Sequence, residues 1–322
     1  VILLYGDYGT SRFMLLRNEN DFFAYPSRPT FNELSKLSVD QSNNLINVGN
    51  EYLNLRLSGK TNDISTKYAY KLRKKLVTKE ILCKKYGWDI SKPIIGIYAS
   101  NWFDYPHAHG LKHFDDFYDW ISSTLFNASN NSQANWIIKP HPCDEWYGVN
   151  DYSEILDIIQ NTNNIKMSDS SWNGLELINS LDAIVTSHGT IGVEAAYLEK
   201  PVLAVGESWY TCGEFVTTAK DKDDYLNRLE QLDWLNFDKS KHNIVRLLSG
   251  LYWAVPKWQN GFYMTDDSEG DNIYLELCNF LDNNANEYIK EIKEIKNWHD
   301  TGHSYYQIYK NISSKEYCMP KI

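Results

Sequence analysis

The chain has 322 residues, which is enough for two domains of ordinary size, each with its own hydrophobic core. Its hydrophobic fraction of 43% is typical of a globular protein, and no apolar run approaches the roughly 20 residues that a membrane-spanning helix requires. A net charge of -10 argues against a general nucleic-acid-binding protein, because neutralising phosphates requires a basic surface.

The five cysteines form no C-x-x-C pair, and their odd number suits reduced thiols better than a disulfide framework or a zinc cage. We therefore expect a cytoplasmic protein. No signal peptide is visible in the sequence. The chain begins at Val1 without an initiator methionine, a start that is typical of a fragment.

Residues 1–91 show a weak pattern of elements. We expect a strand at 1–9, a turn-rich region through Pro26 and Pro29, and a basic helix at 66–86. This segment is too short for a complete Rossmann-like domain.

From residue 92 onward, short β-branched runs alternate with amphipathic helical runs, a pattern typical of a parallel sheet with crossover helices. Strands are expected at 93–100, 135–140, 164–168, 182–187 and 201–206, and helices at 113–126, 152–162, 172–180, 190–199 and 221–232. After Leu232 the strands stop, and helices are expected at 242–254 and 272–296. The predicted fold class is α/β, with a Rossmann-like parallel sheet domain at 92–235.

The sequence KPHP at 139–142 places a histidine between two prolines at the end of the second expected strand of this sheet. Prolines fix φ, so His141 should point out of the carboxyl end of the strand, where open α/β sheets bind ligands. Lys139 and His141 would suit a phosphate there. The spacing alone favours an ordinary histidine in a stiff turn equally well.

The sequence AIVTSHGTIGVE at 183–194 runs from a strand through a turn of small residues into a helix. Free backbone N–H groups at the helix start, with the hydroxyls of Ser187 and Thr190, would form an anion site beside His188. Gly189 would let a ligand approach closely. An ordinary capped turn is the alternative, because Ser and Thr are the usual helix caps.

Three further candidates flank the same edge of the expected sheet. Glu194 lies about one turn beyond Thr190, where it would reach a ribose or a sugar, or simply face solvent. Glu207 and Ser208 follow the next strand. Because parallel strands end at one edge of a sheet, we expect these side chains to flank one crevice.

The loop after the first strand of the sheet carries Asp104, His107 and His109. We expect Asp104 to act as a general base or a nucleophile, with His107 as its partner. No metal is expected, because the spacing of these histidines and His113 matches no closed zinc site. The D-x-D sequence at 221–223 should begin a helix, where carboxylates favour the dipole.

The basic stretch at 67–85 intersperses lysines with tyrosine and leucine. A charged helix face explains this composition most simply. The alternative is contact with anionic membrane lipid or with a pyrophosphate-linked acceptor.

The motifs KPHP at 139–142 and TSHGTIGVEAAYLEKPVLAVG at 186–206 resemble those of the capsular polysaccharide synthesis glycosyltransferases, which include the capsule Kdo transferases. The resemblance covers residues 92–235. It implies a GT-B fold, no metal, and donor-phosphate binding by His141, Ser187, Gly189 and Thr190. The segment WFDYPH also resembles an active-site loop, which implies a catalytic role for Asp104.

On this resemblance, residues 1–91 would be part of an acceptor-side domain, and residues 236–322 would be helices that pack back across the domains. Two departures concern the donor: the acidic-acidic-Gly motif of bacterial sialyltransferases is not evident, and the second position of the Ser-Ser/Thr turn is His188. A CMP-ulosonic acid is the leading expectation, and a UDP- or GDP-hexose stays open.

The sequence therefore predicts a glycosyltransferase that moves Kdo or another ulosonic acid from a CMP-sugar onto a bacterial surface polysaccharide or its lipid-linked precursor. It would act in the cytoplasm, at the inner face of the membrane, with no cofactor besides the nucleotide-sugar donor. Three alternatives stay open: a CDP-polyol phosphotransferase of the teichoic-acid type, a non-catalytic nucleotide- or carbohydrate-binding subunit, and a sugar-nucleotide epimerase.

Overall fold

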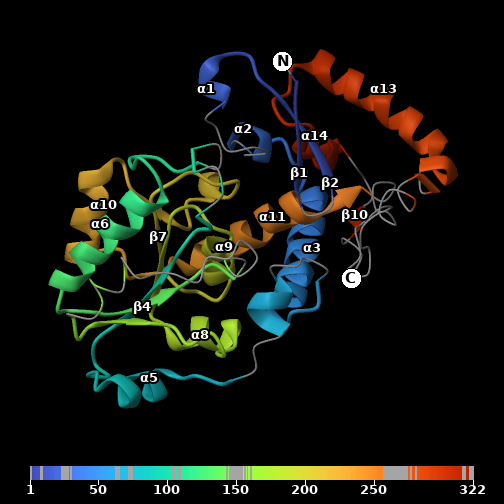
Figure 1. Cartoon of the computed structure of the whole chain (residues 1–322). Coiled ribbons are helices and arrows are strands. Elements are labelled where there is room, and N and C mark those ends of the chain that lie inside the picture. The colour runs from blue at the N-terminus through green and yellow to red at the C-terminus, as the bar shows by residue number, and fades with distance from the viewer. Residues whose placement is uncertain are drawn as a thin grey trace.

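Figure 1 presents the computed structural model of the chain. The structure describes residues 2–7, 10–22, 29, 31–61, 66–71, 75–102, 104, 106–107, 110–142, 144, 155, 157, 159, 162–256, 275, 278–279, 281–313 and 317–318. His109, most of the helix expected at 152–162 and the first part of the one expected at 272–296 lie outside these residues.

A six-stranded parallel sheet lies at the centre of the molecule, in the strand order β5-β4-β3-β6-β7-β8. The strands are β3 (Ile94–Tyr98), β4 (Asn135–Lys139), β5 (Ile165–Met167), β6 (Ala183–Thr186), β7 (Val202–Ala204) and β8 (Thr217–Thr218). The first five coincide with the predicted strands, so the predicted α/β class with a Rossmann-like parallel sheet is confirmed. β8 was not predicted, because two residues give no periodic signal.

Helices cover both faces of the sheet. On one face lie α6 (Phe117–Asn130) and α10 (Lys222–Gln231), which Figure 1 shows side by side. Their buried side chains Trp120 and Tyr225 pack in one cluster with Ile97 of β3. The opposite face is covered by α8 (Gly174–Ser180), α9 (Ile191–Tyr197), α11 (His242–Trp253) and α3 (Val39–Leu57). Strands buried on both faces explain the near-continuous apolar runs in the sequence.

Carboxylate caps fix where two of these helices begin. The side chains of Asp116 and Asp221 accept hydrogen bonds from the backbone N–H groups of Asp119 and Asp224, each at 2.8 Å. The expectation that 221–223 begins a helix is therefore confirmed. The helix expected from residue 113 begins at Phe117 instead, since His113 has a left-handed φ of 69° and Asp116 is the cap.

The long helix α3 is a feature that the sequence pattern missed. Its sequence is rich in asparagine and carries Gly49, which lowers its helix propensity. Its start was nevertheless predictable from the sequence, because Ser38 and Gln41 form a capping box. In this box each side chain accepts a hydrogen bond from the other residue's backbone N–H.

The single basic helix expected at 66–86 is wrong. The structure has a short π-helical segment, Lys67–Lys71, and a separate helix α5 (Lys79–Tyr86). Between them Lys75 forms a parallel β-bridge with Trp172, and the Thr78 side chain caps α5 by accepting from the Ile81 N–H at 3.3 Å. Tertiary pairing of this segment overrides its helical composition.

Helices α3 and α11 cross at two glycines, Gly49 and Gly250. A Cβ atom on Gly49 would collide with the backbone carbonyl of Arg246, and one on Gly250 would collide with that of Leu45. The absence of both side chains lets the two backbones touch. This crossing joins the early helix α3 to the sheet, because α11 also contacts α9.

The remaining elements lie on the side of α3 and α11 away from the sheet, as Figure 1 shows for the hairpin and for α13. They are the antiparallel hairpin β1 (Ile2–Asp7) and β2 (Thr10–Leu15), the antiparallel pair β9 (Val255–Pro256) and β10 (Tyr317–Cys318), and the helices α1 (Glu19–Phe22), α2 (Phe31–Leu34), α13 (Ala285–Thr301) and α14 (Tyr306–Ser313). Two short 3-10 helices, Thr211–Gly213 and Lys239–Lys241, complete the described structure. The expectation that strands stop after Leu232 is wrong, since β9 and β10 follow it. Among the described residues, no helix is long and apolar enough to cross a membrane.

Candidate functional site

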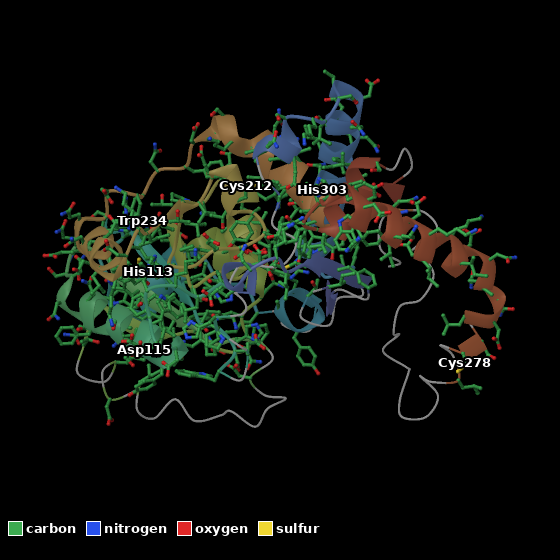
Figure 2. All side chains as sticks on the ribbon, turned by 90° about the horizontal axis from the view of Figure 1, so that it is seen from above. His113, Asp115, Cys212, Trp234, Cys278 and His303 are labelled. Carbon is green, nitrogen blue, oxygen red and sulfur yellow. The ribbon has the colours of Figure 1, made fainter. Side chains whose placement is uncertain are left out.

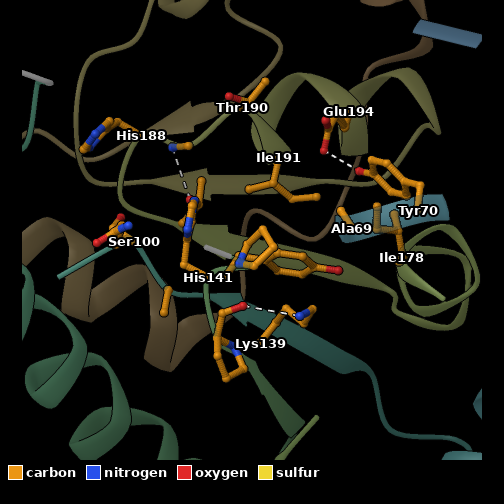
Figure 3. Close-up of a pocket in the computed structure, with 18 of the residues that line it drawn as sticks. Ala69, Tyr70, Ser100, Lys139, His141, Ile178, His188, Thr190, Ile191 and Glu194 are labelled. Atoms are coloured by element: carbon orange, nitrogen blue, oxygen red, sulfur yellow. Dashed lines mark hydrogen bonds between the residues drawn. The ribbon is translucent and has the colours of Figure 1, made fainter. Parts of the chain in front are cut away.

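The carboxyl ends of β3, β4 and β6 meet at one edge of the sheet. There Tyr98 is in register with Lys139 on one side and with Thr186 on the other. A cavity of about 230 Å³ opens at this edge, and Figure 3 shows it in close-up. The predicted site residues that line it are Asp104, Lys139, His141, His188, Gly189, Thr190 and Glu194. Residues from three separate sequence motifs thus share one cavity.

The KPHP segment forms one wall of the cavity. Lys139 is buried, and its Nζ donates to the carbonyl of Pro140 at 3.3 Å. Burial and the neighbouring charge of Lys139 lower the pKa of His141 to about 4. At neutral pH the imidazole of His141 is therefore uncharged, and it offers a ligand a hydrogen bond while Lys139 supplies the positive charge.

The turn between β6 and α9 forms the facing wall. The Gly189 N–H donates to the Thr186 hydroxyl at 3.3 Å, and the buried Tyr210 hydroxyl donates to the Gly189 carbonyl at 2.6 Å. Thr190 occupies the N-cap position of α9, and its side chain makes no capping hydrogen bond to the helix. The N–H groups of Gly192 and Val193 donate to the carbonyls of Gly189 and Thr190, at 2.9 and 3.1 Å. At the start of α9 the described structure therefore leaves the N–H of Ile191, which lines the cavity, for an anion.

Two predicted residues of this turn lie differently from their neighbours. Ser187 is fully buried, and its hydroxyl is 2.5 Å from that of Ser100, which lines the cavity in its place. The ring of His188 stacks on Phe117 of α6, with 5.8 Å between the ring centroids. Figure 3 places His188 at the end of the cavity opposite Glu194.

Glu194 lies at the deep end of the cavity in a buried cluster. Arg56 Nε donates to Oε1 of Glu194 at 2.5 Å, and the Tyr70 hydroxyl donates to Oε2 at 2.5 Å. Arg56 and Glu194 are 4% exposed each, so water screens this ion pair poorly. The expectation that Glu194 faces the cavity agrees with its position, whereas the alternative of a solvated helix residue is wrong.

The loop after β3 carries the predicted catalytic pair, and the structure separates its members. Asp104 is exposed and lines the cavity. His107 does not line it, because its Nε2 bonds to the Asp115 carbonyl at 2.9 Å and its Nδ1 to the Leu111 carbonyl at 3.4 Å. The described bonds of His107 thus tie it to the loop before α6.

Glu207 and Ser208 follow β7 but are not among the residues that line the cavity. Glu207 forms an ion pair with Lys112 at 2.5 Å, and its N–H donates to the Gly110 carbonyl at 2.9 Å. Ser208 is buried, and its N–H donates to the Thr211 hydroxyl at 2.7 Å. In the described structure both residues stabilise loops beside the cavity.

Potential metal ligands do not gather in the part of the chain that is described. No group of three or more His, Cys, Asp or Glu side chains there has the geometry to hold a metal ion. Figure 2 shows His113 and Asp115 at the α6 side of the molecule, well away from His303, and Cys212 and Cys278 in different regions. Of the cysteines whose side chains are described, Cys83, Cys212 and Cys278 form no disulfide.

Sequence reasoning missed several cavity residues, among them Arg56, Tyr70 and Tyr98. Arg56 carried a signal, because it continues the buried face of α3 defined by Tyr52 and Leu53 at helical spacing. Charged residues are seldom buried unless they are paired. An arginine on an apolar helix face therefore indicates a buried carboxylate partner, although the sequence does not say which one.

Three lysines of the basic stretch, Lys75, Lys79 and Lys85, have acidic or aromatic neighbours. Lys79 pairs with Asp182 at 2.8 Å and Lys75 with Asp169 at 3.3 Å. Lys85 lies 4.0 Å from Asp169 and also above the Trp172 ring. The contacts with Asp169 and Trp172 attach the segment to the loop after β5, and the pair with Asp182 attaches it to the residue before β6.

The cavity and its two motif-bearing walls lie largely within the part of the chain that resembles a known family. Residues 113–231 match the family of capsule polysaccharide biosynthesis proteins. This match confirms the resemblance that the motifs at 139–142 and 186–206 predicted. The capsule family segment supplies β4, β6 and the start of α9, while Arg56, Tyr70 and Tyr98 lie outside it.

Solved structures that resemble the chain are distant from it in sequence. The β-Kdo 2,4 transferase KpsC of Thermosulfurimonas dismutans is 16% identical, with a TM-score of 0.39 over 66% of this chain and 56% of its own. HepE of Anabaena, solved with UDP-glucose, is 14% identical, with a TM-score of 0.35 over 54% of this chain and 47% of its own. The wall teichoic acid polymerase TagF is 13% identical, with a TM-score of 0.34 over 54% of this chain and 39% of its own.

The TM-scores are low, so these likenesses assign neither a donor nor an activity to this chain. The chain spans about half of the length of the first solved structures that it matches. A search of curated proteins finds no relative that matches the sequence.

Proposed function

We propose that the cavity binds the phosphate of a nucleotide sugar and that the chain is the donor-binding part of a glycosyltransferase of capsule polysaccharide synthesis. One observation carries this proposal: the KPHP wall and the Gly189–Thr190 turn, which are far apart in the sequence, face each other across one cavity at the carboxyl edge of the sheet. Open α/β sheets bind ligands at this edge.

The chemistry of the two walls supports a phosphate ligand. Lys139 provides a positive charge, His141 provides a hydrogen bond, and Ile191 provides a backbone N–H at the start of α9. These groups would neutralise the charge that develops on a departing nucleotide phosphate. On this basis we propose transfer without a metal ion.

Asp104 is the carboxylate that we propose to act on the acceptor hydroxyl or on the anomeric carbon. It is exposed at the cavity, where an acceptor could reach it. The position of His107 supports a role in holding this loop through the Asp115 and Leu111 carbonyls. We assign it no direct part in the transfer.

The finer assignments extend the same proposal. We propose a GT-B arrangement in which 92–235 binds the donor, 1–91 completes the site, and 236–322 packs back across both. Arg56 and Tyr70 support this, because they bring residues of 1–91 to the cavity. The donor that we propose is a CMP-linked ulosonic acid, and the acceptor a bacterial surface glycan or its lipid-linked precursor at the inner face of the membrane.

Calorimetric titration of the protein with CMP, CDP, UDP and GDP tests the donor site. We expect one nucleotide to bind best and His141→Ala to weaken its binding at least tenfold, about 1.4 kcal/mol. His299→Ala, an exposed histidine of α13, is the matched control. Failure of all four nucleotides to bind would overturn the donor-site assignment.

Product analysis separates glycosyl transfer from the other enzymatic outcomes. With a nucleotide sugar and a glycan acceptor we expect a glycosidic product and free nucleotide, formed equally well in the presence of EDTA. Transfer of a phosphate to the acceptor would instead indicate a polyol phosphotransferase, and conversion of the donor without acceptor would indicate an epimerase.

A further inference from the structure

The hydroxyl of Tyr98 is buried and has no hydrogen-bond partner among the described residues. Three other buried tyrosines differ from it. Tyr70 donates to Glu194, Tyr210 donates to the Gly189 carbonyl, and the Tyr225 hydroxyl bonds to Thr124 at 2.8 Å. A buried polar group without a partner is costly, so a protein retains one where a ligand or water supplies the partner.

The place of Tyr98 identifies which part of a ligand it would meet. Its side chain lines the cavity, and its backbone lies between Lys139 and Thr186 at the edge of the sheet. Burial and then the charge of Glu194 raise the pKa of the Tyr98 hydroxyl, so it stays protonated and Glu194 lies within electrostatic reach. The hydroxyl of this cavity residue is therefore a donor.

Glu194 supplies an acceptor in the same cavity. Its Oε1 accepts from Arg56 and its Oε2 from Tyr70, as Figure 3 shows for Tyr70. Each carboxylate oxygen has two lone pairs, so both oxygens retain the capacity to accept from a ligand. Arg56 and Tyr70 hold the carboxylate in place.

A donor and an acceptor that line one cavity match one chemical group above others. A hydroxyl both accepts and donates, so it satisfies Tyr98 and Glu194 together, whereas a phosphate oxygen would be repelled by the carboxylate. The remaining wall here is apolar and small, with Ala69, Gly174 and Ile178, which suits the face of a ring.

We propose that Tyr98 donates a hydrogen bond to, and Glu194 accepts one from, a ring hydroxyl of the bound nucleotide sugar. This rests on the proposed function and adds a second subsite to it: the His141 end holds the phosphate and the Tyr98 end selects a hydroxylated ring. The ring is the ribose or the transferred sugar, and the two are distinguished by the ligands chosen below.

The test is Tyr98→Phe, which removes only the hydroxyl, titrated with CMP, 2′-deoxy-CMP, UDP, 2′-deoxy-UDP and UDP-glucose. If the ring is ribose, the variant should bind the ribonucleotides about tenfold more weakly than the wild type and should bind the 2′-deoxy forms equally well. If the ring is the transferred sugar, only the affinity for UDP-glucose should fall. Equal affinities of the variant and the wild type for all five ligands would overturn the proposal.

Thermal unfolding without ligand excludes a purely structural role. Because the Tyr98 hydroxyl has no described partner, Tyr98→Phe should leave the melting temperature unchanged or raise it slightly. A lower melting temperature with unchanged ligand affinity would show that Tyr98 serves the fold and would contradict the assignment. Tyr86→Phe, whose hydroxyl lies 3.5 Å from the Met167 carbonyl outside the cavity, is the matched control.

The failure of this inference is distinguishable from that of the proposed function. If the wild type binds none of the nucleotides, the donor site itself is wrong. If the wild type binds and Tyr98→Phe binds equally well, the phosphate site stands and only the ring-hydroxyl subsite is wrong.

Discussion

The two ends of the cavity are built in different ways. At the His141 end, the residues that face a ligand come from the loops directly after β4 and β6, and each lies within a short motif. At the Glu194 end, the carboxylate meets Arg56 and Tyr70, which are 138 and 124 residues away in the sequence. One end is made by local chain geometry and the other by long-range packing.

This difference determines whether a substitution at each end should affect folding or ligand binding more. The His141 end relies on a buried lysine, a neutral imidazole and backbone groups. The Glu194 end relies on a buried ion pair, in which each partner compensates the other. Substitutions at the Glu194 end should therefore affect folding most, and substitutions at the His141 end should affect ligand binding more.

The largest effect is expected from Arg56→Met. It leaves the Glu194 carboxylate buried without its cation, and we expect a loss of about 3 to 5 kcal/mol in the free energy of unfolding, measured with urea. Lys79→Met breaks a more exposed pair with Asp182 and should cost no more than about 1 kcal/mol. Equal costs for the two variants would show that the buried pair is not what stabilises this end.

An intermediate effect is expected from pH at the His141 end. Folding lowers the pKa of His141 from its ordinary 6.5 to about 4, so below pH 6.5 the unfolded chain takes up a proton that the folded chain does not. The contribution of His141 to the free energy of unfolding is therefore fully present above pH 6.5. It falls by roughly 3 kcal/mol as the pH decreases towards 4. Urea unfolding at pH 7 and pH 4.5 should therefore show a smaller loss for His141→Gln than for the wild type.

His299→Gln serves as the control for this pH dependence, because its side chain is exposed on α13. Its loss of stability between the two pH values should match that of the wild type. A wild type and a His141→Gln variant with the same pH dependence would contradict the burial of a neutral imidazole at this wall.

The smallest effect is expected from Tyr210→Phe. The variant removes the hydrogen bond to the Gly189 carbonyl and should cost about 1 kcal/mol in the free energy of unfolding. Tyr118→Phe, an exposed tyrosine of α6, should cost almost nothing. Gly189 forms the turn at the His141 end, so nucleotide affinity should fall several-fold in Tyr210→Phe and stay unchanged in Tyr118→Phe. An unchanged affinity in Tyr210→Phe would show that this hydrogen bond does not shape the turn.

The same difference explains how much of the molecule was predictable from its sequence. Five strands of the sheet were predicted because their β-branched runs are short and regular. The position of His141 followed from the rule that parallel strands end at one edge. Each of these inferences needed only neighbouring residues.

The rest required information that a local pattern does not contain. The basic helix expected at 66–86 was wrong because Lys75 pairs with Trp172, a partner that composition does not reveal. Arg56 and Tyr70 were missed because no neighbouring residue in the sequence indicates that Glu194 is their partner. Ser187 was predicted to bind phosphate from its place in the turn, but burial of its hydroxyl against Ser100 depends on how two loops meet.

The crossing of α3 and α11 at Gly49 and Gly250 has a consequence for the order in which the chain is synthesised. A ribosome makes the chain from its N-terminus, so α3 emerges long before the helix on which it docks. Until residue 253 has emerged, α3 lacks its crossing partner, and Arg56 lacks the Trp253 ring over which its guanidinium lies. The His141 wall can form as soon as its strands pair, whereas the Glu194 end is assembled only when α11 has been translated.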